Sequence, residues 1–180
     1  MDKFQNKYRI PTARLQGYDY GSNGCYYVTI CTKDRIHYFG EIVNGEMQLS
    51  EIGEIAEKFW TDIPNHFPFV ILDQYVIMPN HIHGISFFNK SVETDNYPSL
   101  RSPNKFGRQS QNLGSVIRGF KSSLKRYANE NNIDFAWQER FHDSIIRDNN
   151  GLNNVRNYIF NNPQNWNDDE LNDKNTNIAP

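Results

Sequence analysis

The chain lacks the features that suit a membrane or an oxidising environment. No run of apolar residues approaches the roughly 20 that a helix needs to cross a bilayer, and no apolar stretch follows Met1 to Lys7. We therefore expect no membrane partner and no signal peptide. Only two cysteines occur, Cys25 and Cys31, too far apart on one strand-like stretch to bridge each other. Free thiols of this kind suit a reducing compartment, so we expect a cytoplasmic protein.

Acidic residues are absent from one long segment, although the net charge of the whole chain is only −2. Between Arg101 and Arg126 there are seven basic residues and no acidic one, so the rest of the chain carries −9. A basic loop followed by a solvated helix face would show the same pattern. The functional interpretation is a path for a phosphate backbone, and the candidate DNA-binding residues are Arg118, Lys121, Lys125 and Arg126.

The hydrophobic pattern predicts an α+β fold, in which helices pack on an antiparallel sheet. Asn44-Gly45 is a strong signal for a tight hairpin, and Ser50 is a suitable N-cap for a helix that stops near Pro64. We expect strands at 26–32, 38–43, 46–49, 70–78, 82–88 and 141–147, and helices at 51–63, 113–127 and 150–161. At 180 residues the chain suits one domain, over 1–166, with a polar loop at about 89–112 and a polar, acidic tail at 167–180.

A His-x-His pattern directly follows the strand predicted at 70–78. In an extended chain, His81 and His83 point to the same face, about 6.6 Å apart along the strand, and Ile82 points to the other face. Two neutral imidazoles on one face can converge on a divalent metal. The alternative is a pair of strand histidines on a wet face.

Two polar residues on the last predicted helix could complete such a site. Tyr158 and Asn162 are four positions apart, so they lie about one turn from each other on one face. Asn162 offers a hard carbonyl oxygen that suits Mg²⁺ or Mn²⁺, and Tyr158 offers a phenol that can act as a covalent nucleophile. The alternatives are an ordinary aromatic at the core edge and a helix C-terminal residue before Pro163.

Glu139 and His142 lie beside the strand predicted at 141–147. Either is a candidate to assist proton transfer. Polar residues on a short strand also serve as hydrogen-bonding groups on the surface of a sheet, and that alternative stays open.

From about Arg14 to Trp166 the chain resembles the HUH single-tyrosine transposases, in particular the REP-associated tyrosine transposase branch. The order of the matching motifs makes the resemblance specific. They are Tyr27–Thr32, Met78–Ile85, Gly119–Ser122, Trp137–Asp143 with Ile146–Asp148, and Tyr158–Pro163. The resemblance implies a ferredoxin- or RRM-like HUH nuclease domain.

By the same resemblance, His81 and His83 are metal ligands, Asn162 is the third ligand and Tyr158 is the nucleophile. Insertion-sequence relatives commonly carry Gln at the last ligand position, and the Asn here matches the REP-associated branch. The implied cofactor is Mg²⁺ or Mn²⁺.

The implied function is that of a single-stranded DNA endonuclease and strand transferase, a transposase or nickase that acts at hairpin DNA through a 5′-phosphotyrosine intermediate. The protein would work as a monomer or a homodimer. One alternative is a catalytically degenerate nucleic-acid-binding module with an RRM-like sheet, which would bind without cleaving. Another is a hydrolase of the histidine-triad kind, which would need a third alternating histidine where this chain has Ile85.

Overall fold

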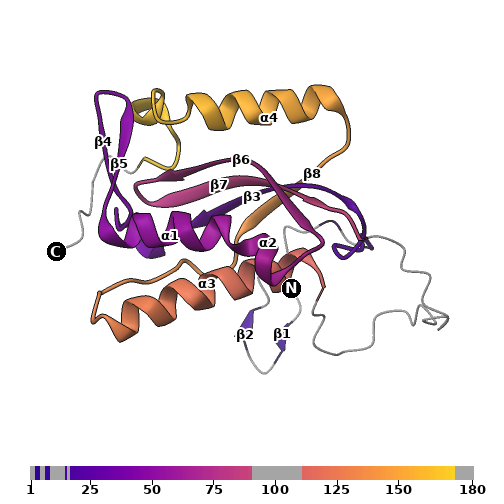
Figure 1. The fold of residues 1–180 in the computed structure, drawn as a ribbon, viewed down its shortest axis with the longest axis horizontal. Coiled ribbons are helices and arrows are strands. Elements are labelled where there is room, and N and C mark those ends of the chain that lie inside the picture. Colours follow the sequence, from indigo (N-terminus) through magenta and orange to yellow (C-terminus); the bar gives the residue numbers. More distant parts are fainter. Residues whose placement is uncertain (1–2, 5–6, 9–14, 16, 91–110, 173–180) are drawn as a thin grey trace.

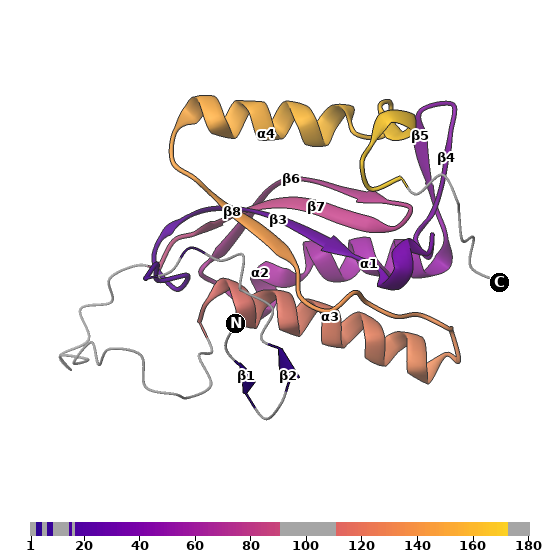
Figure 2. The same ribbon diagram turned by 180° about the vertical axis from the view of Figure 1, so that it is seen from behind.

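A four-stranded antiparallel sheet forms the centre of the molecule. The computed structural model describes residues 3–4, 7–8, 15, 17–90 and 111–172; most of the loop expected at 89–112 and the end of the tail lie outside these ranges. The strands occur in the order β6 (Val70–Met78), β7 (His81–Phe88), β3 (Gly24–Cys31) and β8 (His142–Ile146). Helices α1 (Glu51–Thr61), α2 (Ile63–His66) and α3 (Leu113–Glu130) lie on one face, and α4 (Asn149–Asn161) lies on the other (Figures 1 and 2).

The connectivity is that of a ferredoxin-like fold. Along the chain, β3, α1, β6, β7, α3 and β8 occur in the order β-α-β-β-α-β, with a hairpin and short helices inserted between some of them. Neighbouring strands in the sheet all pair antiparallel. The predicted α+β class, with helices packed on an antiparallel sheet, is therefore confirmed. The helix that the pattern predicts at the end of the chain is additional to this unit and covers the free face of the sheet.

Local signals place most elements where they are expected. The hairpin of β4 (Gly40–Val43) and β5 (Glu46–Leu49) turns at Asn44 and Gly45, whose φ angles of 54° and 80° are those that a two-residue turn of this kind requires. Ser50 caps α1 by accepting a hydrogen bond from the backbone N–H of Gly53. The shorter elements are β1 (Lys3–Phe4), β2 (Lys7–Tyr8), η1 (Lys33–Arg35) and η2 (Trp166–Asp168). No described helix is long and apolar enough to cross a membrane.

Two apolar clusters of unequal size hold the layers together. The larger cluster fills the space between the sheet and α1 and α3, and Ile82 of β7 belongs to it. The smaller cluster joins the sheet to α4 and consists of buried Cys25, Ile85 and Ile159 with partly buried neighbours. Strand β7 contributes to both clusters because successive side chains of a strand point to opposite faces. The residues that alternate with Ile82 therefore face α4.

A β-bulge interrupts strand β6. Leu72 pairs with Ser86 and Tyr75 pairs with Gly84, so that Asp73 and Gln74 together stand opposite Ile85. The extra residue shifts the alternation of the strand by one position. As a result Leu72 and Tyr75, three positions apart, both pack against the larger cluster. The same shift leaves the Asp73 side chain free to contact α4 on the opposite face.

Candidate active site

The two histidines of the His-x-His motif lie together under α4. His81 and His83 occupy a central strand, are 0% and 2% exposed, and have ring centroids 4.5 Å apart. Ile82 between them is fully buried in the larger cluster. The expectation that the two imidazoles share one face is confirmed, and the alternative of a wet face is wrong because both rings are buried.

A neighbouring amide determines which nitrogen of His81 carries the proton. The Nδ2 group of Asn80 donates to the carbonyl oxygens of Arg35 and Leu171, so its Oδ1 is the acceptor end of the amide. His81 Nδ1 lies 2.8 Å from this Oδ1 and must donate to it. In the neutral ring, Nε2 then carries a lone pair, and this atom is buried without a hydrogen-bond partner. Burial lowers the pKa of His81 well below its usual range, which favours the neutral form.

His83 is oriented by two hydroxyl groups of β3. Its Nδ1 lies 2.7 Å from the Tyr27 hydroxyl and 2.9 Å from Thr29 Oγ1. Its Nε2 lies 3.4 Å from the hydroxyl of Tyr158 on α4. Burial lowers the pKa of His83 to about 4, so this ring is also neutral at pH 7.

Asn162 stands at the end of α4 with its amide held in one orientation. The residue keeps helical angles (φ −59°, ψ −42°) despite the proline that follows, so it stays about one turn from Tyr158. Its Nδ2 group donates to Asp169 Oδ2 at 2.7 Å. Because the carboxylate can only accept here, the Oδ1 atom of Asn162 is the opposite end of the amide. That oxygen is buried and has no hydrogen-bond partner.

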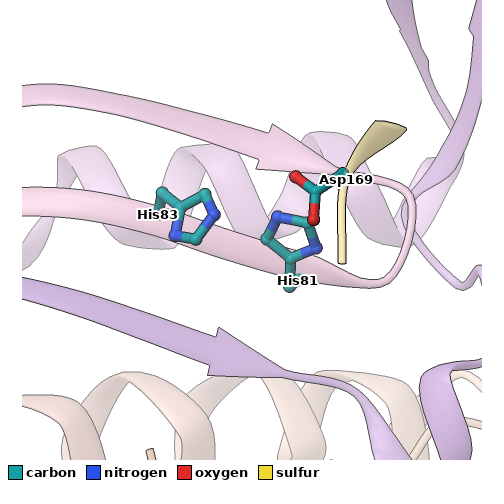
Figure 3. Close-up of side chains that lie close together, drawn as sticks. All are labelled: His81, His83 and Asp169. Carbon is teal, nitrogen blue, oxygen red and sulfur yellow. The ribbon is translucent and has the colours of Figure 1, made fainter. Parts of the chain in front are cut away.

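Asp169 lies beside the candidate site residues, a position that the sequence did not reveal. Its carboxylate lies beside the two histidines (Figure 3), and one ligand atom from each of the three residues falls within 4.8 Å of the others. Asp169 belongs to the segment expected to be a polar, acidic tail. Acids stand on both sides of it in the sequence, Asp168 and Glu170, and no spacing distinguishes it from them.

The donor set fits a divalent metal. His81 Nε2 and Asn162 Oδ1 are buried polar atoms that make no hydrogen bond of normal geometry, although the Asn162 side chain lies close enough to His81 to affect its pKa. Such an arrangement is costly unless something else satisfies both atoms. The amide oxygen suits Mg²⁺ or Mn²⁺, and the two imidazole nitrogens favour a first-row transition metal such as Mn²⁺ over Mg²⁺. Asn80, Thr29 and Asp169 orient these groups from behind, as the outer partners of a metal site do.

Tyr158 lies at the mouth of this cluster. Its side chain is 47% exposed, and its ring centroid is 5.2 Å from that of His83. Burial, followed by the nearby charge of Asp169, raises the pKa of the phenol, which therefore keeps its proton at neutral pH. A cavity of about 470 Å³ lies beside this residue, and its lining includes Tyr158, Asn162, Asp169 and His142.

The two candidates for proton transfer separate in the structure. His142 is paired with Thr29 in the sheet register and lines the cavity of Tyr158. Glu139 is not among the described residues that line this cavity; its charge acts on Lys121 instead. Of these two candidates, His142 is therefore the one that lies beside the cavity of Tyr158.

The four basic candidates gather at a different place. Arg118, Lys121, Lys125 and Arg126 line a second cavity of about 620 Å³ beside Trp137 and Arg140. Most of the residues that line this cavity belong to α3, and α3 lies on the sheet face opposite α4 (Figure 1). Lys121 donates to the carbonyl oxygens of Gln138 and Arg140, and Lys125 donates to that of Phe135, so these two amino groups also hold the chain between α3 and β8.

The titration of His83 provides a test of its burial. We expect the Cε1–H resonance of His83 to keep its neutral-form NMR shift until the pH approaches 4, because burial disfavours the charged ring. In the unfolded chain a histidine titrates near 6.5. The unfolded state therefore binds the proton first, and the free energy of unfolding of the metal-free protein should fall as the pH drops from about 6.5 towards 4. A His83 midpoint near 6.5 in the folded protein would contradict the burial.

Known proteins resemble the chain in sequence and in fold. No protein-family model matches it. An uncharacterized protein of Haemophilus influenzae is 38% identical over 162 residues, which cover 88% of this chain and 90% of that protein. A second protein of the same organism, named "Putative REP-associated tyrosine transposase", is 27% identical over 146 residues, or 81% of this chain and 73% of that protein.

A solved structure shows the same fold. It is a REP-associated tyrosine transposase bound to a REP hairpin, with a TM-score of 0.59 and 16% identity over 87% of this chain and 74% of that chain. At 16% identity, this match supports the fold alone. The chain belongs to one family with the uncharacterized Haemophilus influenzae protein, and its resemblance to the REP-associated tyrosine transposases is confirmed.

Proposed function

We propose that the protein cuts and rejoins single-stranded DNA at a hairpin through a covalent link to Tyr158, as a transposase does. One observation carries the proposal: a half-exposed phenol stands 3.4 Å from a buried, neutral imidazole at the mouth of a cavity. The unpartnered His81 Nε2 and Asn162 Oδ1 lie in the same cluster. Tyr158 reaches His83 of its own chain, which supports cleavage within one monomer.

The relatives support the choice of substrate. One is named for transposition, and the solved structure of the same fold is bound to a REP hairpin. The basic cavity along α3 offers a second contact for a nucleic acid, since Arg118 and Arg126 on its lining are exposed. We propose that these two arginines contact phosphates there. Lys121 and Lys125 contribute through those N–H groups that do not already donate to carbonyl oxygens.

We propose that His81, His83 and Asn162 hold a divalent metal, Mg²⁺ or Mn²⁺, with Asp169 beside them. When bound, such an ion polarises a phosphate oxygen and stabilises the charge that develops on it. The protein's part is to present uncharged imidazoles and a correctly turned amide. Asn80 fixes the tautomer of His81, the hydroxyls of Tyr27 and Thr29 orient His83, and Asp169 orients Asn162.

The proposed reaction is a transesterification. The hydroxyl oxygen of Tyr158 attacks phosphorus, and the bond from phosphorus to the 3′ oxygen breaks as the new bond forms. The 3′ oxygen leaves with the electron pair and takes up a proton, while the phenol proton passes to a base. His142 is the candidate for this exchange because it lines the same cavity. A phenolate is a tolerable leaving group, so an incoming 3′ hydroxyl can reverse the step without ATP.

The C-terminal boundary that we propose for the domain differs from the one expected from the sequence. The polar tail was expected to begin after residue 166, but Asp169 contacts Asn162, and the Leu171 carbonyl accepts a hydrogen bond from Asn80. We propose that the domain extends to residue 172.

Substitution of the nucleophile is the most direct test. Tyr158→Phe removes the attacking oxygen and leaves the ring, so we expect no covalent protein–DNA adduct on a denaturing gel, with a hairpin-DNA Kd within about twofold of that of the unchanged protein. If the unchanged protein binds the hairpin but forms no adduct, the protein is a binding module instead. If the Phe variant still forms the adduct, another residue is the nucleophile.

Metal binding can be tested without DNA. Asp169→Asn keeps an acceptor for the Asn162 amide but removes the charge, so we expect Mn²⁺ affinity to fall about 10- to 100-fold, as is usual for outer partners of metal sites. Electron paramagnetic resonance of free Mn²⁺ measures this. The matched control is Asp168→Asn, an exposed acid that lines the same cavity; its affinity should change less than about twofold. Equal loss in both variants would contradict a specific role for Asp169.

Salt dependence tests the basic surface on α3. Each phosphate contact to single-stranded DNA contributes about −0.7 to the slope of log affinity against log salt. We expect Arg118→Gln with Arg126→Gln to make the slope shallower by about 1.4, measured by fluorescence anisotropy. Lys58→Gln, an exposed base on α1, is the control. An unchanged slope in the double variant would exclude these arginines as phosphate contacts.

A further inference from the structure

Few apolar contacts hold the helix that carries Tyr158. Ile159 is the single fully buried residue of α4. It packs with Cys25 and Ile85 in the small cluster, which Leu152 and Val155 of the same helix join only partly buried. The opposite face of the sheet packs on a cluster several times larger. Tyr158 and Phe160 beside it are 47% and 69% exposed. A helix attached through so narrow a stripe needs a further contact to fix its rotation about its own axis.

An ion pair supplies that contact. Arg156 Nε donates to Asp73 Oδ1 at 2.8 Å, and the terminal Nη2 group of Arg156 donates to Asp73 Oδ2 at 2.6 Å. The pairing is bidentate, which fixes direction as well as distance. Among the ion pairs of the described residues, this one joins α4 to the sheet.

The bulge in β6 presents the acceptor. Asp73 is one of the two residues that stand opposite Ile85, and its Oδ1 also accepts a hydrogen bond from the backbone N–H of Gln74, at 2.7 Å. Its side chain is 18% exposed and Arg156 is 40% exposed. The Gln74 backbone therefore orients the Asp73 carboxylate independently of its contact with the Arg156 guanidinium.

Arg156 and Tyr158 lie on opposite sides of the buried stripe. At about 100° per residue, Arg156 is displaced by about 60° from Ile159 in one direction, and Tyr158 by about 100° in the other. The contacts agree with this count, because Arg156 reaches the edge strand β6 whereas Tyr158 reaches His83 on the central strand β7. A rotation of α4 about the stripe therefore moves both side chains together.

We propose that the Arg156–Asp73 ion pair sets the rotation of α4 and so holds the Tyr158 hydroxyl at the metal cluster. Both are positioning residues, and the inference rests on the proposed role of Tyr158 as the nucleophile. Side chains extend to about 5–6 Å from a helix axis, so a rotation of about 10° moves a side-chain tip by about 1 Å. A misplacement of about 1 Å can cost about 100-fold in rate.

Rates at saturating DNA separate positioning from binding. We expect Asp73→Asn and Arg156→Gln each to slow single-turnover adduct formation about tenfold or more, with hairpin Kd and Mn²⁺ affinity within twofold. The double variant should be no slower than the slower single variant, because both changes remove one interaction. Arg156→Lys keeps the charge but cannot make both hydrogen bonds of the guanidinium. Its rate of adduct formation should therefore lie between those of the unchanged protein and of Arg156→Gln. Asp62→Asn, which breaks the exposed pair of Asp62 with His66, is the matched control and should change nothing.

Hydrogen–deuterium exchange of the DNA-free protein tests the hold on α4 independently of cleavage. We expect amides of residues 152–162 to exchange several-fold faster in Asp73→Asn, with α3 unchanged. Unchanged exchange of the α4 amides in Asp73→Asn overturns the inference. A slower rate of adduct formation that is matched by equal losses of DNA affinity and of Tm overturns it as well. If the unchanged protein forms no adduct, the proposed function fails, and the exchange experiment still decides whether the ion pair holds α4.

Discussion

Two uncharged imidazole rings lie buried between the central sheet and α4, and their burial determines how the surrounding groups are arranged. A buried ring must be neutral, and each of its nitrogens needs a partner or a ligand. Asn80 satisfies one nitrogen of His81 and leaves the other with a free lone pair. Tyr27 and Thr29 orient His83 through one nitrogen, and its other nitrogen lies 3.4 Å from the Tyr158 hydroxyl. Hydrogen bonds from neighbouring groups thus hold both rings in their orientations.

The two faces of the sheet differ in what they carry. The face toward α1 and α3 carries the large apolar cluster, which stabilises the fold, and the outer side of α3 carries the basic cavity. The face toward α4 carries few apolar residues and all of the polar cluster around His81 and His83. The apolar cluster under α4 is therefore the smaller one, because polar groups take some of the positions under the helix. Contacts such as Arg156 with Asp73 then matter more than they would on a well-packed helix.

Much of the fold was predictable because the local signals agree with one another. Asn44-Gly45 specifies its turn through positive φ angles, Ser50 specifies the start of α1, and period-2 and period-3.6 patterns separate strands from helices. Alternation along β7 correctly places His81 and His83 on one face. Helical spacing correctly places Tyr158 and Asn162 one turn apart. These relations span at most a few residues, so they depend little on the rest of the chain.

Relations between distant segments could not be derived in this way. The approach of Asp169 to the histidines depends on how the chain turns after α4, and nothing in the acidic tail distinguishes that residue from Asp168 or Glu170. The tautomer of His81 depends on the orientation of the Asn80 amide, which is set by the carbonyl oxygens of Arg35 and Leu171. By itself the sequence determined the elements, the shared face of the two histidines and the tyrosine–asparagine spacing, because backbone periodicity sets them. Only the tertiary structure decided which polar atoms are buried without partners, because burial depends on the packing of α4 and the segment after it against the sheet.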